Sequence, residues 1–168
     1  MKQVVILLFF CLVQTESYAQ NEKITTATID SLYVKALNNR FDLTLSSGYI
    51  SLEPTAESKR IKNKQVSNRY KFPSSEELKI RALQEKKTIG LIRLGHKIIS
   101  NDTIDINLTN VGYTAEQIKH SNGIVVSNEI FAISCGGTKG YQPSMRFVYD
   151  KIKNDWILIY NSSTETEN

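Results

Sequence analysis

The chain has 168 residues and a formal net charge of +4, from 21 lysines and arginines against 17 aspartates and glutamates. This mildly basic balance is well below the concentrated Lys/Arg footprint of nucleic-acid-binding proteins, so we expect no nucleic-acid partner. The length fits one domain with one core, which at this size buries roughly two thirds of the unfolded surface.

Residues 1–19 are predicted to be a cleavable secretory signal peptide. Lys2 precedes an apolar run from Val4 to Val13, which is too short to span a bilayer, and Ser17-Tyr18-Ala19 supplies small residues before the expected cleavage site. We therefore expect a mature domain of residues 20–168 in a periplasm or outside a bacterial cell, without a membrane span.

The first element of the expected domain is a helix. Apolar residues from Ile29 to Leu37 recur at the spacing of an amphipathic helix, and Thr25, Thr26 or Thr28 can cap its start. Apolar and polar residues then alternate over residues 41–46, which predicts a strand that resumes around residues 49–52.

Residues 53–71 have few apolar side chains and are predicted to form a long solvated loop. The loop carries six basic residues, namely Lys59, Arg60, Lys62, Lys64, Arg69 and Lys71. Ser74 followed by Glu77 is the signature of a capping box, so a second helix is expected to begin there.

The rest of the chain is predicted to be mainly β, apart from a short helical turn within residues 114–122. β-branched or alternating stretches mark strands at residues 89–99, 104–108, 124–135, 145–152 and 156–160, with a frayed tail over residues 161–168. We therefore predict an α+β fold, in which two helices pack on one face of a curved antiparallel sheet of about five to six strands.

This order of elements, with an N-terminal helix and a final hairpin that carries Trp156, resembles the cystatin-like and nuclear-transport-factor-like small domains. The resemblance implies a concave pocket. It implies no particular activity, because the group includes both enzymes and binding modules.

Cys135 is the only cysteine outside the predicted signal peptide, so no intramolecular disulfide is expected. Two interpretations stay open. Cys135 is a nucleophile with His96 or His120 as general base, or it is a small buried side chain at a strand end.

The glycine-rich segment after Cys135 is a second candidate site. Its backbone amides could hold an anion with the help of Lys139, or the segment is an ordinary hairpin connection. The candidate ligand-binding residues are Gly136, Gly137, Lys139, Gly140 and Tyr141. We predict no metal and no cofactor, because the two histidines and the cysteine have no ligand spacing.

The basic loop, with Tyr70 and Phe72 near its end, is the third candidate, since it could bind an acidic partner. In addition, Asp102-Thr103-Ile104 resembles a bacterial O-glycosylation acceptor at a predicted turn. The leading hypothesis is an exported, non-enzymatic domain that binds an unknown small molecule or protein through its concave sheet face or the glycine loop. The alternatives are a thiol-dependent hydrolase or transferase centred on Cys135, and an inhibitor or immunity-type protein that acts through the basic loop.

Overall fold

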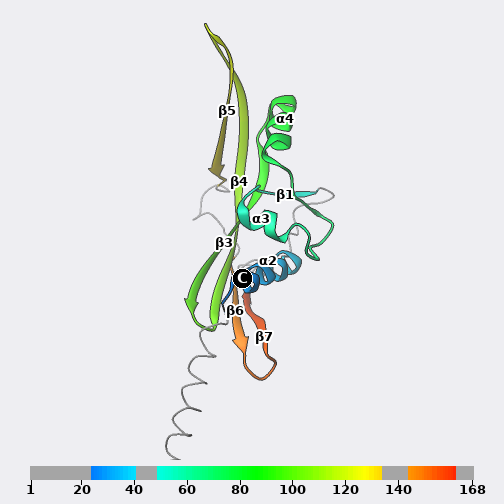
Figure 1. Ribbon diagram of the computed structural model, residues 1–168, viewed down its shortest axis with the longest axis vertical. Helices are drawn as coiled ribbons and strands as arrows, with labels where there is room; N and C mark the ends of the chain where they lie inside the picture. The colour runs from blue at the N-terminus through cyan, green and yellow to red at the C-terminus, as the bar shows by residue number, and fades with distance from the viewer. Residues whose placement is uncertain (1–23, 41–48, 134–143, 162–168) are drawn as a thin grey trace, which may run out of the picture.

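The computed structural model describes residues 24–40, 49–133 and 144–161, which form three helices and a seven-stranded, mostly antiparallel open sheet (Figure 1). The predicted α+β class is confirmed, but the expected five to six strands are too few. The helices are α2 (Thr26–Asn39), α3 (Ala56–Ile61) and α4 (Ser75–Glu85). The strands are β1 (Ile50–Leu52), β2 (Tyr70–Lys71), β3 (Ile89–Ser100), β4 (Thr103–His120), β5 (Gly123–Ala132), β6 (Ser144–Asp150) and β7 (Asp155–Asn161).

Both predicted helices begin where their capping residues indicate. The hydroxyl of Thr25 accepts a hydrogen bond from the amide of Thr28 at 3.1 Å, ahead of α2. At α4, the amide of Glu77 donates to the Ser74 hydroxyl at 3.1 Å and the Ser74 amide donates to the Glu77 carboxylate at 2.6 Å. Each box satisfies amides that have no partner within the first helical turn.

The prediction of a long loop over residues 53–71 is wrong in part, because this segment contains α3 and β2. Thr55 and Ser58 form a reciprocal capping box that starts α3, and the fully buried Ile61 anchors its end. Tyr70 is buried and lies beside Ile50, which explains the short strand β2.

The sheet order is β2-β1-β3-β4-β6-β7, and β5 also pairs with β4. β1 runs parallel to β2 and β3, and the other pairs are antiparallel. β4 is long enough to pair with β6 over Thr103–Asn107 and with β5 over Val111–His120. The helical turn expected within residues 114–122 is therefore wrong, because β5 holds most of that segment in a hairpin.

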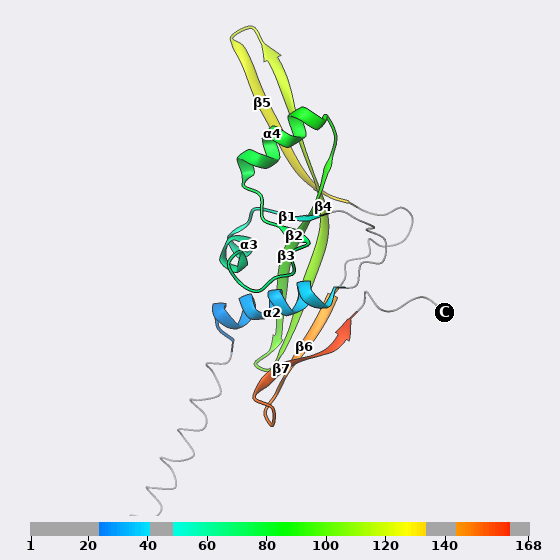
Figure 2. The ribbon, with the colours of Figure 1, turned by 90° about the vertical axis from the view of Figure 1, so that its right-hand side faces the viewer.

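The core is divided into two clusters on opposite faces of the strands. Ile92 and Leu94 of β3 belong to the larger cluster under α2, whereas Ile89 and Leu91 belong to a smaller one under α4. The β3–β4 register is unbroken here, so the buried face changes between Leu91 and Ile92 without a bulge. Figure 2 shows α4, α3 and α2 following one another along the length of these strands.

No helix within the described ranges combines the length and the apolar character that crossing a bilayer requires. Residues 1–23, which include the predicted signal peptide, and the tail from residue 162 lie outside the described residues.

Candidate functional site

The predicted thiol site and glycine loop cannot be placed, since residues 134–143 lie outside the described residues. These residues include Cys135, Gly136, Gly137, Lys139, Gly140 and Tyr141. The two candidate histidines lie far apart. His96 pairs with Ile106 and His120 lies at the far end of β4, so about 14 residues of extended strand, roughly 45 Å, separate them.

His96 contacts Tyr33 of α2 rather than any nucleophile among the described residues. Its Nδ1 lies 2.7 Å from the Tyr33 hydroxyl, and the two rings meet edge to face. Burial raises the pKa of Tyr33 to about 12, and the nearby Glu57 carboxylate adds to the rise. The Tyr33 hydroxyl is therefore protonated at neutral pH, and its hydrogen bond with His96 ties β3 to α2.

We expect this tyrosine to make the fold sensitive to alkali. An unfolded tyrosine loses its proton near pH 10, whereas folded Tyr33 keeps it to about pH 12. Its contribution to stability is thus complete below pH 10 and is lost as the pH rises from 10 to 12. Absorbance titration of Tyr33→Phe should lack a component that titrates near pH 12 in the wild type. Loss of a component near pH 10 instead would contradict the burial argument.

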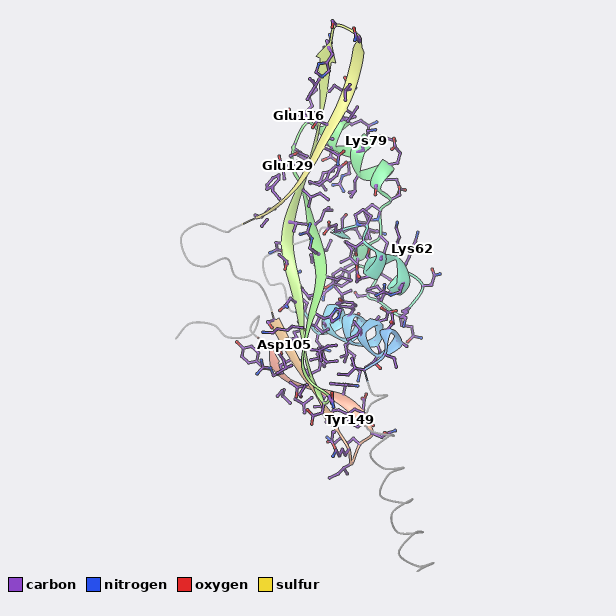
Figure 3. The ribbon with its side chains drawn as sticks, turned by 60° about the vertical axis from the view of Figure 1, so that its left-hand side comes forward. Lys62, Lys79, Asp105, Glu116, Glu129 and Tyr149 are labelled. Carbon is purple, nitrogen blue, oxygen red and sulfur yellow. The ribbon has the colours of Figure 1, made fainter. Side chains whose placement is uncertain are left out.

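The six basic residues of the predicted loop separate into two groups. The arginines are used internally: Arg60 Nε donates to Asp30 at 3.1 Å, and Arg69 Nη2 donates to the Arg40 carbonyl at 2.7 Å. The lysines, by contrast, have exposed side chains. Lys62, which is labelled in Figure 3, follows the last residue of α3 on the helical side of the sheet.

Three of these lysines border two adjacent depressions at the β2 edge of the sheet, of about 540 and 710 Å³. Tyr49, Lys71 and Phe72 line both depressions, which therefore form one continuous feature. We call it the edge groove. Its basic end is lined by Tyr49, Lys62, Lys64, Val66, Ser67, Asn68, Tyr70, Lys71 and Phe72, and its other end by Tyr49, Ser51, Lys71, Phe72, Pro73, Glu77, Arg81 and Glu85.

The segment that carries the lysines is hydrogen-bonded to the C-terminal end of α2. The Asn38 side chain donates to the Gln65 carbonyl at 3.0 Å and accepts from the Ser67 amide at 3.0 Å. The buried Tyr70 hydroxyl donates to the Leu37 carbonyl at 2.8 Å. These bonds join the loop to the end of a packed helix, so the groove is held in position by the core.

The lysines of the edge groove form no ion pair with any described carboxylate. Among the described residues, no carboxylate lies within ion-pair distance of Lys62, Lys64 or Lys71. The Nζ of Lys71 lies 3.9 Å from the centroid of the Tyr49 ring, a cation–π contact that leaves its charge in place. The basic end of the groove is thus a fixed cluster of positive charge beside exposed aromatic surface.

The chain matches no family model, no curated protein and no solved structure. The resemblance to cystatin-like and nuclear-transport-factor-like domains therefore stays a prediction. The described residues hold no group of three or more His, Cys, Asp or Glu side chains arranged to bind a metal ion.

A third depression, of about 600 Å³, lies between the end of α4 and β4. It mixes charges of both signs, since Lys86, Lys87 and Glu116 all line it. Lys87 also pairs with Glu85 at 3.0 Å. This depression therefore offers a ligand less unpaired charge than the edge groove does.

Sequence reasoning identified the lysines of the groove but missed Tyr49, which is 71% exposed. Tyr49 reaches Lys71 only because β1 and β2 pair in parallel, with Ile50 beside Tyr70 and Ser51 beside Lys71. A pairing between positions 20 residues apart has no local sequence signal. The predicted glycosylation residue Thr103 is half-buried at the start of β4, with its hydroxyl 3.1 Å from the Asp102 carboxylate.

Proposed function

We propose that this chain is an exported, non-enzymatic domain that binds an anionic ligand in the edge groove. The observation that carries the proposal is the cluster of Lys62, Lys64 and Lys71, which has no carboxylate partner among the described residues and lies beside Tyr49. Unpaired lysines around a depression attract phosphate or carboxylate groups, and a nearby aromatic ring adds apolar contact area.

The shape of the groove supports an extended ligand with its acidic end over the lysines. The far end changes character, because Glu77, Arg81 and Glu85 line it. The capping contacts with Ser74 hold the pKa of the Glu77 carboxyl below its usual range, and Lys62 contributes a smaller attraction. Glu77 is therefore ionised at neutral pH and repels a second acidic group at that end.

The test compares two triple variants with equal change in charge. Lys62→Gln, Lys64→Gln and Lys71→Gln remove the charge of the groove, whereas Lys119→Gln, Lys151→Gln and Lys153→Gln remove exposed charges elsewhere. The probe is a labelled peptide with three glutamates at one end and neutral residues after them, followed by fluorescence anisotropy, with inorganic pyrophosphate as the competitor. We expect the groove variant to bind at least ~10-fold more weakly, and the control variant to bind within about 2-fold of wild type.

Two results would separate the sources of the anionic group. Competition by pyrophosphate below millimolar concentration points to phosphate, whereas its failure beside tight peptide binding points to carboxylates. Binding should also weaken as salt is raised, because the lysines are exposed. Equal weakening in both triple variants would show that net charge, rather than the groove, attracts the probe, and would overturn the proposal.

A further inference from the structure

β5 and the end of β4 form an arm that extends beyond the helices (Figures 1 and 2). Residues 114–120 of β4 pair with β5 alone among the described strands, because the β3 register ends at Tyr113. Every residue from Glu116 to Ile133 is exposed except the half-buried Val126. Apolar side chains are exposed on both faces of the arm, with Ile124 60% and Val125 55% accessible.

The outer edge of β5 pairs with no other described strand and lacks the usual protection against pairing. Exposed edges are commonly blocked by proline, lysine or a bulge. β5 contains no proline and no lysine, and its register with β4 is continuous over ten residues. Its one charged residue is Glu129, which Figure 3 shows on the arm together with Glu116.

The backbone groups of β5 that point away from β4 belong to its even-numbered residues. The Ile133 amide donates to the Asn110 carbonyl at 3.2 Å, in line with the β4–β5 register. Because hydrogen-bonding direction alternates along a strand, odd-numbered residues bond to β4 and even-numbered residues face outward. The outward residues are Ile124, Val126, Asn128, Ile130 and Ala132.

The pattern of apolar and polar residues in β5 is symmetric about Asn128. Three apolar residues, Ile124-Val125-Val126, precede the polar Ser127-Asn128-Glu129, and the apolar Ile130-Phe131-Ala132 follows. In an antiparallel pair of two such strands centred on Asn128, Val126 lies opposite Ile130 and Val125 lies opposite Phe131. Glu129 then lies opposite Ser127 of the other strand instead of opposite its own copy, which avoids like-charge repulsion.

We propose that β5 pairs with β5 of a second copy of this chain, antiparallel and centred on Asn128, to form a two-fold symmetric dimer. The outward amides and carbonyls of the two strands bond to each other, and the two arms become one four-stranded ribbon. A strongly charged partner is disfavoured, since the strand presents a single carboxylate and otherwise apolar or neutral groups.

Sedimentation velocity of the full chain over a range from about 1 to 300 µM tests the proposal. Wild type should show a concentration-dependent dimer. Asn128→Pro removes the outward amide at the symmetry centre and spares the β4–β5 bonds, so it should weaken the dimer at least ~10-fold. Asn128→Ala keeps that amide and should dimerise within about 3-fold of wild type.

Charged substitutions at Asn128 give a second test, which remains valid even if the proline variant misfolds. Asn128→Lys alone and Asn128→Glu alone should each be monomeric, because two like charges meet at the centre, and an equimolar mixture should restore a dimer. A wild type that stays monomeric at 300 µM overturns the proposal, even if β5 captures an added extended peptide. A dimer that all these variants leave unchanged also overturns it.

Discussion

Replacing Phe147 with alanine is expected to lower the free energy of unfolding by about 3 to 5 kcal/mol. Phe147 is 1% exposed and lies in β6 between Ile104 of β4 and Leu158 of β7. Its ring fills the larger core cluster where the final hairpin joins the sheet. Removing it leaves a cavity and weakens the packing of the final hairpin on the sheet, where Met145 and Trp156 still contribute to the same cluster.

Urea unfolding measures this effect, and Ile159→Ala is the matched control. Ile159 lies in β7 but is 60% exposed, so its truncation should cost less than about 1 kcal/mol. The midpoint of the Phe147→Ala transition should fall while its slope is unchanged. Similar losses in the two variants would mean that Phe147 does not occupy the core.

Replacing Gly112 with valine is expected to destabilise the protein by about 1 to 3 kcal/mol. A Cβ atom at this position would lie 2.6 Å from the Phe131 ring and 2.9 Å from the Thr88 methyl group. Phe131 therefore packs directly on the backbone of β4, and any side chain at Gly112 must displace it from the base of the arm.

Gly90 provides a control of the same size in the paired strand. It lies directly opposite Gly112 in the β3–β4 register, yet no atom would lie within 4 Å of its added Cβ. Gly90→Val should be neutral or slightly stabilising, because valine favours extended backbone. Thermal unfolding of both variants distinguishes them, and equal losses would argue against close packing of Phe131.

Local signals predicted the elements that local interactions determine. The capping residues Thr25 and Ser74 mark the starts of α2 and α4, and alternating apolar residues mark the terminal hairpin. These signals lie within a few residues of the structure they specify, so a single sequence is enough to find them.

The missed features depend on contacts between distant parts of the chain. The capping box of α3 has Ser58 at the third helical position, where a glutamate or glutamine is usual, so the motif was not recognised. α3 buries Ile61 only because α2 lies beside it. Residues 114–120 show no clean alternation of buried and exposed positions, because both faces of the arm are exposed. The change of buried face at Leu91–Ile92 likewise cannot be predicted from a pattern that assumes one face throughout.

The positive charge of the edge groove could be predicted from the sequence, but its shape could not. The lysines are visible as a basic run, but which basic residues are neutralised depends on Asp30 and the Arg40 carbonyl, both in or next to α2. Only the folded structure shows that Arg60 is paired with a carboxylate, whereas Lys62 has no such partner among the described residues.

The position of the edge groove in the sheet has a consequence for the order of folding. Ser100 and Thr103 pair across the tight turn between β3 and β4, so this hairpin closes at little entropic cost. β1 joins β3 through residues 51 and 91, and β2 joins β1 through residues 50 and 70, which requires much longer loops to close. We therefore expect the groove to be completed late and to open first, so that a bound anion would slow the earliest opening of the native state.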